Sequence, residues 1–238
     1  MDKKIERLIV GAIGTNCWFY QFHEALNKVN EADEDPPGVQ ICVVIDPGEE
    51  AERIISKLQE LNWIPGYILL THGHFDHLAA LPDLVTASAK GAFGQNQLPK
   101  IGIHRMDAHY LGKDALSAHR ESMRAAGGSA AYVDALWKSM PDADILFEDG
   151  DTIGPFRIVH IPGHTRGSVG FYDEENAVLF SGDTLFRGNW GRTDLPGGDE
   201  EEIYKSLKRL LSMESETVVY PGHGPNTKIG NEARLLNG

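Results

Sequence analysis

The feature that most constrains this chain is a set of histidine and aspartate residues directly after predicted buried strands. The densest group, residues 72–77 (HGHFDH), follows the apolar run Tyr67–Leu70. His164, Asp183 and His223 also follow predicted strands, and each is flanked by glycine. Small neighbours let the backbone bend sharply and leave these side chains free to reach a ligand. We therefore expect the fold to gather them in one place.

The spacing within residues 72–77 suits ligands that converge. Alternate residues of an extended segment face the same way, so His72 and His74 can reach one point, and Asp76 and His77 a second point nearby. Ten histidines in 238 residues is high, and at this chain's own frequencies HxHxDH would arise by chance in about one such sequence in a thousand. Ordinary loop residues bonded to the backbone are the alternative, but clustered imidazoles would repel one another on protonation. The sequence predicts a metal site.

The number and type of these residues indicate more than one metal ion. Seven candidates exceed the four ligands of a tetrahedral structural zinc site. They suit two ions about 3.5 Å apart, with a bridging carboxylate and open positions for water. A hydroxide held between the ions would be the nucleophile. Imidazole and carboxylate without thiolate indicate Zn, Mn or Fe, and we expect zinc, with iron or manganese as alternatives. The seven candidates are His72, His74, Asp76, His77, His164, Asp183 and His223.

The rest of the chain alternates between strand and helix patterns. A helix over 49–63 is expected to end at Pro65-Gly66, and the alanine-rich stretch 106–140 predicts two helices broken at Gly127-Gly128. The polar segment 31–38 predicts an exposed loop, and the acidic run 199–202 the first turn of a helix over 200–213. Strands are predicted at 15–20, 40–45, 67–70, 156–161, 168–172, 177–180 and 217–220. This order predicts a single α/β domain over 1–238, with a helical insertion around 105–141.

Composition limits the classes of function. The chain is 41% hydrophobic and 24% charged, and no apolar run is long enough for a membrane span. A net charge of −13 gives no general attraction for nucleic acid. The two cysteines, Cys17 and Cys42, form no CxxC motif and are expected to be small buried residues. With no signal peptide recognised, we expect a cytoplasmic protein with a small-molecule substrate and neither a membrane nor a nucleic-acid partner. The sequence is compatible with a homo-oligomer.

These motifs resemble those of the metallo-β-lactamase superfamily, whose hallmarks occur in order as Asp46, residues 72–77, His164, Asp183 and His223. The resemblance implies a four-layer αββα sandwich with the site at one edge of two central sheets. It also implies one metal ion on His72, His74 and His164, and a second on Asp76, His77 and His223. Asp183 would bridge them, and Asp46 would orient a ligand without binding metal.

Within that superfamily, residues 182–198 and the ending 221–232 look like glyoxalase II-like hydrolases, also called hydroxyacylglutathione hydrolases. Such enzymes cleave thioesters such as S-lactoylglutathione by attack of the metal-bridging hydroxide on the carbonyl. Asp76 and Asp183 would be the catalytic residues, Asp76 by handling a proton as well as binding metal. The longer glyoxalase II enzymes carry a glutathione-binding helical domain, whereas only 15 residues follow His223 here. We expect the 106–140 helices to form the pocket wall instead.

Three residues after Asp183 are candidates for substrate contact: Arg187, Trp190 and Arg192. Arginines in such a position also commonly fix a loop by pairing with a neighbour such as Asp194. The same resemblance leaves two alternative functions open. One is an iron-dependent persulfide dioxygenase, which uses a single iron, and the other is a lactonase or another esterase of the superfamily.

Overall fold

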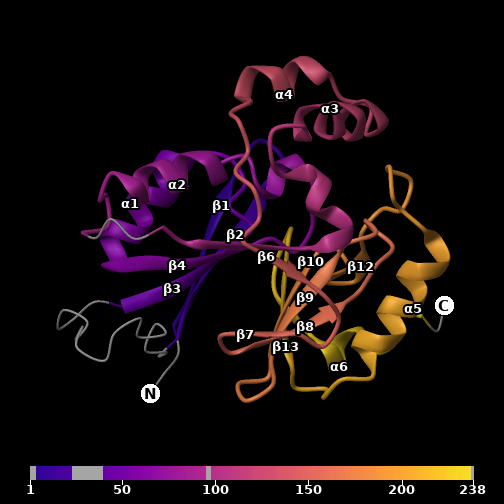
Figure 1. Cartoon of the computed structure of the whole chain (residues 1–238). Helices are drawn as coiled ribbons and strands as arrows, with labels where there is room; N and C mark the ends of the chain where they lie inside the picture. The colour runs from indigo at the N-terminus through magenta and orange to yellow at the C-terminus, as the bar shows by residue number, and fades with distance from the viewer. Residues whose placement is uncertain (1–3, 23–39, 95–97, 237–238) are drawn as a thin grey trace.

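Two six-stranded sheets form the centre of the molecule (Figure 1). The structure is a computed structural model that describes residues 4–22, 40–94 and 98–236, so the loop predicted at 31–38 lies outside the described residues. The first sheet has the spatial order β1 (Ile5–Val10), β2 (Thr15–Gln21), β3 (Gln40–Ile45), β4 (Trp63–Leu69), β5 (Lys100–His104) and β6 (Ile145–Phe147). The second has the order β14 (Thr227–Lys228), β13 (Val218–Pro221), β10 (Val178–Gly182), β9 (Val169–Asp173), β8 (Phe156–His160) and β7 (Thr152–Ile153).

Helices lie on the outer faces of these sheets (Figure 1). The first sheet is covered by α1 (Ala51–Leu61) and α2 (Leu81–Ala89), and the second by α5 (Glu200–Leu211) and α6 (Ile229–Glu232). Two further helices, α3 (Ala115–Ala125) and α4 (Ala130–Leu136), project together beyond the sheets. Short 3-10 helices cover Phe75–His77 and Arg105–Tyr110, and β11 (Leu185–Phe186) pairs with β12 (Asn189–Trp190) as a separate ribbon. The predicted αββα sandwich is confirmed.

Three separate apolar clusters hold the four layers together. Strand side chains alternate between the two faces of a sheet. On β2, Phe19 therefore packs toward the outer helices, while Trp18 and Tyr20 pack between the two sheets. On β10, Phe180 packs between the sheets and Leu179 faces the cluster under α5. Because these central strands are buried on both faces, they read as continuous apolar runs.

One sequence expectation was wrong, because Pro65 does not end a helix. Helix α1 stops at Leu61, where Asn62 adopts a left-handed conformation with φ 55°. Pro65 lies inside β4, opposite Cys42, and the register then shifts so that Val43 faces Tyr67. This bulge accommodates the proline, which cannot donate a ladder hydrogen bond.

The predicted helical segments are otherwise present. The stretch 106–140 holds α3 and α4, with Gly127 and Gly128 between them, and a 3-10 helix before them. The acidic run forms the start of α5, where the Asp199 side chain accepts a hydrogen bond from the backbone N–H of Glu202. Both cysteines are buried and free. In the part of the chain that the structure describes, no helix combines the length and apolar character needed to cross a membrane.

The two sheets are tied together at one edge. The Asn16 backbone N–H donates to the carbonyl of Gly222 at 2.7 Å, and Thr15 forms a bridge with His223. On the other side, the N–H of Val169 donates to the carbonyl of Thr71 at 2.8 Å. These bonds fix the loops that follow β4 and β13 against the opposite sheet.

Candidate metal centre

The seven predicted ligands meet at this tied edge. Residues 72–77 follow β4 of the first sheet, whereas His164, Asp183 and His223 follow β8, β10 and β13 of the second. The chain thus brings four loops from two sheets to one place. The side chains form two groups, each of three residues, with Asp183 beside both.

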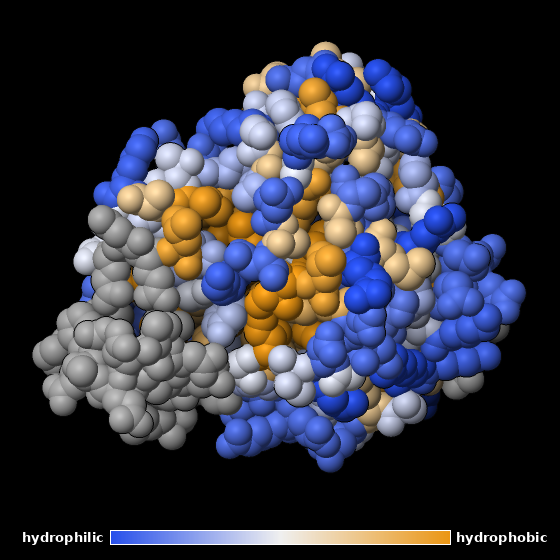
Figure 2. All heavy atoms as spheres, in the orientation of Figure 1, coloured by the Kyte–Doolittle hydropathy of each residue, from blue (hydrophilic) through white to orange (hydrophobic). Residues whose placement is uncertain are grey.

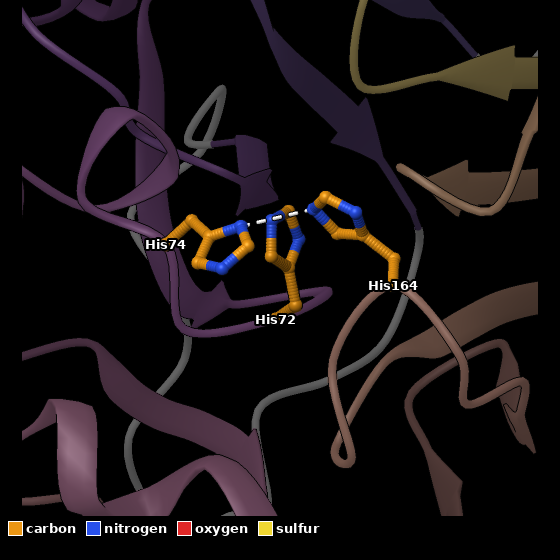
Figure 3. A group of neighbouring side chains, drawn as sticks. All are labelled: His72, His74 and His164. Carbon is orange, nitrogen blue, oxygen red and sulfur yellow. Dashed lines mark hydrogen bonds between the residues drawn. The ribbon is translucent and has the colours of Figure 1, made fainter. Parts of the chain in front are cut away.

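The first group consists of His72, His74 and His164, whose rings face one another (Figure 3). Nε2 of His164 lies 2.9 Å from Nδ1 of His74, and the ring centroid of His72 is 4.8 Å from each of the other two. All three side chains are buried. One nitrogen from each ring can therefore reach a common point.

The second group consists of Asp76, His77 and His223. Oδ2 of Asp76 lies 3.2 Å from Nε2 of His77 and 3.4 Å from Nε2 of His223. The two histidine nitrogens are 3.3 Å apart. These three atoms lie within 3.4 Å of one another, and one carboxylate oxygen takes the place of one imidazole nitrogen of the first group.

Asp183 lies between the two groups. Its Oδ2 is 3.7 Å from Nε2 of His164 in the first group and 3.5 Å from Nε2 of His223 in the second. Its Oδ1 is 3.5 Å from Nε2 of His77. A single carboxylate within reach of both groups is the geometry of a bridging ligand in a two-metal site.

The buried atoms that lack a partner test whether a cation fits here. Within the described residues, Nε2 of His72 and Oδ1 of Asp183 are both buried and have no hydrogen-bond partner. Leaving such atoms unpaired costs about 1–3 kcal/mol each. The His72 ring contacts Thr71 through Nδ1, and the Thr71 hydroxyl donates to Asp46, so Nε2 carries a free lone pair. The lone pair on Nε2 of His72 and the anionic Oδ1 of Asp183 lie in the same cluster of ligands, and such a pair fits a divalent cation.

Glycine is required at position 222. A Cβ there would lie 2.2 Å from Oδ1 of Asp183 and 2.7 Å from Cε1 of His77. The backbone before His223 can therefore approach the other ligands only because it carries no side chain. This contact explains in part why glycine precedes a ligand in the sequence.

Neighbouring groups orient two of the imidazoles. Oδ2 of Asp46 lies 3.0 Å from Nδ1 of His77, and Asp46 also accepts from the Thr71 N–H and hydroxyl. Nδ1 of His164 lies 2.7 Å from the carbonyl oxygen of Arg192. Each contact places the proton on Nδ1 and leaves Nε2 facing the cluster. Because the Asp46 oxygens are already bonded, its proximity to His72 and His77 does not make a third ligand group.

The pKa values within the cluster favour a cation. Burial lowers the pKa of His72, and burial with the nearby His164 lowers the pKa of His74 to about 3. Burial would raise the pKa of Asp183, but His77 and His223 outweigh it and lower the pKa to about 2. The site thus offers neutral imidazoles and an ionised carboxylate. These are the forms that bind metal.

The pKa values of His77 and His223 shift in the opposite direction. Burial alone would lower the pKa of His77, but Asp76, Asp183 and Asp46 raise it well above its usual value. Burial is likewise outweighed at His223, where Asp76 and Asp183 raise the pKa. A metal ion therefore competes with protons on this side of the site.

A cavity of about 660 Å³ opens onto both groups. His74, Asp76, His164, Asp183 and His223 all line it. Helices α3 and α4 contribute a wall, as expected from the sequence, through residues that include Met123 and Tyr132. This cavity is the candidate substrate chamber, and it is called the chamber below.

The three predicted substrate residues are placed differently from one another. Arg192 lines the chamber but pairs with Asp194, with two contacts of 2.7 Å. Trp190 packs against Tyr204 of α5, with ring centroids 5.6 Å apart, and does not line the chamber. Arg187 is exposed and also lies outside the lining residues. The structure brings only Arg192 to the chamber.

Asp107 was not singled out from the sequence. It is buried, and its carboxylate accepts hydrogen bonds from the N–H groups of Gly73 and Gly167 and from the Thr165 hydroxyl, at 2.7–2.9 Å. It thereby joins the loop of His72 and His74 to the loop of His164. Asp107 belongs to no sequence motif, and its hydrogen-bond partners are 34 to 60 residues away along the chain. No local pattern therefore identifies it.

Comparison with known proteins agrees with this architecture. Residues 39–223 match the family described as the metallo-beta-lactamase superfamily. The chain is 36% identical over 196 residues to hydroxyacylglutathione hydrolase GloC of Haemophilus influenzae, covering 81% of this chain and 84% of that protein.

Two solved structures are similar over nearly the whole chain. TTHA1623, crystallised in a di-iron-bound form, superposes with a TM-score of 0.73 at 35% identity, covering 97% of this chain and 98% of that one. The B3 metallo-beta-lactamase BLEG-1 superposes with a TM-score of 0.72 at 34% identity, covering 96% of each chain.

Proposed function

This chain belongs to the metallo-β-lactamase superfamily as a metal-dependent hydrolase, and from that premise we propose that it cleaves thioesters at a two-metal site. The observation that carries the proposal is the position of Asp183 between two three-residue groups that open onto one chamber. The likeness to GloC, whose name describes hydrolysis of hydroxyacylglutathione, supports a thioester substrate. The di-iron form of TTHA1623 supports two metal ions.

The seven candidate ligands divide between two metal ions. His72, His74 and His164 would hold one ion, and Asp76, His77 and His223 the other, with Asp183 reaching both. When bound, such ions lower the pKa of a coordinated water and polarise a carbonyl oxygen. Zinc remains the metal we propose, and the di-iron relative supports iron as the alternative.

The chain's own groups prepare this site for hydrolysis. Asp46 and the Arg192 carbonyl fix the ring orientation of His77 and His164. Oδ2 of Asp76 accepts a hydrogen bond from the Thr15 hydroxyl at 3.0 Å, and this bond fixes a carboxylate that lines the chamber. In the proposed reaction Asp76 accepts a proton from the attacking water. A thiolate is a good leaving group, so cleavage needs little general acid catalysis.

The experiment is thiol release from S-D-lactoylglutathione by protein loaded with zinc, iron or manganese. Turnover above about 1 per second would lie in the range of ordinary enzymes and support the proposal. Asp183→Asn should lower the rate at least ~100-fold, because it weakens the bridge between the two groups. The control is Asp134→Asn, the same change at an exposed residue of α4 that pairs with Arg120 of α3. This variant should retain the wild-type rate. Full activity of Asp183→Asn would overturn the two-metal assignment.

The likeness to BLEG-1 supports hydrolysis of a β-lactam as a second candidate. The same metal-loaded protein should be assayed with nitrocefin and with the thioester at equal concentrations. Faster nitrocefin cleavage would favour the second candidate.

A further inference from the structure

The chamber is lined mainly by apolar side chains away from the metal ligands. Phe75 lies within the ligand loop 72–77, and Met123 and Ala126 come from α3 and the turn after it. Phe186 and Leu195 line it from the segment after Asp183. Figure 2 shows hydrophilic and apolar residues mixed over the outward surface of the α3–α4 projection, and the projection adds the apolar side chain of Met123 to the chamber.

The chamber offers little to a negatively charged substrate. Among the described residues that line it, Arg192 is the sole lysine or arginine, and both its contacts go to Asp194. Of the chamber-lining residues that the structure describes, Glu49 is the only carboxylate away from the metal ligands, and it accepts a hydrogen bond from the Tyr132 hydroxyl. A glutathione carrier has two carboxylates, and burying them without cations is costly.

The polar groups of the α3 wall are neutral. Nε2 of His119 lies 2.9 Å from the carbonyl of Tyr110, while its Nδ1 is buried without a partner. Burial lowers the pKa of His119 to about 4, so the ring is neutral at pH 7. The Ser122 hydroxyl lies 3.1 Å from the Tyr110 hydroxyl. These groups can meet a hydroxyl or amide but cannot neutralise an anion.

We propose that the thioester cleaved here carries an uncharged, largely apolar chain that occupies the chamber against Met123, Phe186 and Leu195. This inference rests on the thioesterase function proposed above and names its substrate class. The apolar chain can be the acyl group or can belong to the thiol, and the assay separates the two.

The test compares kcat/KM for S-D-lactoylglutathione with that for neutral thioesters of increasing chain length. One arm lengthens the acyl group from acetyl through butyryl to hexanoyl on N-acetylcysteamine, and the other lengthens the thiol of S-acetyl alkanethiols. Burial of each added methylene should raise kcat/KM about three- to fourfold in the arm that reaches the chamber. kcat/KM should then rise about tenfold from the butyryl to the hexanoyl thioester, or over the equivalent step in thiol length.

Matched variants test whether the dependence of kcat/KM on chain length arises in the chamber. Met123→Gln should reduce the gain per methylene, whereas Met106→Gln, the same change at an exposed residue outside the chamber, should retain it. Calorimetric binding of a hexyl ketone analogue, in which a methylene replaces the thioester sulfur, gives a readout that does not depend on turnover. Binding should weaken about tenfold in Met123→Gln and not in Met106→Gln.

The outcomes separate the two proposals. A rise with chain length in either arm, together with faster cleavage of neutral thioesters than of S-D-lactoylglutathione, supports the apolar substrate class. Preference for S-D-lactoylglutathione with flat chain-length series would overturn it and leave the thioesterase function standing. Failure of the metal-loaded protein to cleave any of these thioesters would overturn both.

Discussion

Asp107 and Gly73 are joined by a 2.9 Å hydrogen bond from the backbone N–H of Gly73 to Oδ2 of Asp107. Gly73 separates His72 from His74, so this bond fixes the backbone between two predicted ligands of one ion. The same carboxylate reaches Gly167 and Thr165, on the loop of His164. One side chain thus sets the relative position of all three imidazoles in the first group.

Asp107→Asn should weaken metal binding although it touches no metal ligand side chain. Both oxygens of Asp107 face donors, so either orientation of an asparagine amide places an N–H against another donor. We expect metal affinity to fall about 10- to 100-fold, with a loss of about 1–3 kcal/mol in the free energy of unfolding. Competition with a chromophoric chelator measures the affinity. Asp114→Asn, an exposed aspartate in the same segment, is the control, and equal affinities of the two variants would contradict the positioning role.

Gly222→Ala should disrupt the bridge between the two groups. The new Cβ would lie 2.2 Å from Oδ1 of Asp183, which forces that carboxylate to move. We expect hydrolysis to fall at least ~100-fold and the bound metal per chain to decrease. Gly230→Ala, whose Cβ would lie 3.1 Å from Ser215, should bind metal normally. A Gly222→Ala protein with wild-type metal content would show that the close approach is unnecessary.

Metal binding should release protons. Since Asp76 and Asp183 raise the pKa values of both His77 and His223, these rings hold protons in the metal-free protein over a wider pH range than free histidine does. An incoming cation must displace them, so metal affinity should decrease as pH falls, by up to ~10-fold per pH unit for each proton displaced. Calorimetry at pH 7 in buffers of different ionisation enthalpy counts the protons. Heats that are identical in every buffer would contradict this prediction.

His104 should make the protein less stable in acid. Burial, helped by the stacked ring of His160 at 4.2 Å, lowers the pKa of His104 to about 4. The unfolded chain binds this proton near pH 6.5 and the folded chain only near 4, so stability falls as pH decreases through that interval. The full contribution is on the order of 1–3 kcal/mol.

His104→Asn tests this directly, since asparagine cannot titrate but can still accept the Met106 N–H bond that His104 accepts at 3.3 Å. Urea unfolding between pH 7 and 4 should show a shallower loss of stability than in the wild type. His109→Asn, at an exposed position, should follow the wild-type curve. Parallel curves for His104→Asn and wild type would refute the assignment.

Much of this architecture could be predicted from local patterns. Residues 72–77 were identifiable because a dense polar motif directly follows an apolar strand. The glycines beside Asp183 and His223 indicated sharp backbone bends that leave these side chains free to reach a ligand. The sandwich followed from the resemblance, and the structure adds its reason, which is three apolar clusters between four layers.

Features that depend on distant partners were not predictable in this way. Pro65 looked like a helix terminator because its acceptance in β4 depends on a bulge opposite Cys42 and Val43. Trp190 looked like a pocket residue because the sequence does not show that Tyr204 packs against it. Asp107 could not be predicted because its role depends on hydrogen bonds from Gly73 and Gly167, which lie on two other loops.

The two-metal centre is tested by the number of metal ions that the wild-type chain holds. Protein stripped of metal, titrated with zinc and dialysed should retain two ions per chain by elemental analysis, because His72, His74 and His164 form one group and Asp76, His77 and His223 another. Asp183→Asn, prepared in parallel, should retain fewer. One ion per wild-type chain at saturation, with an unchanged count in Asp183→Asn, would contradict a two-metal centre bridged by Asp183.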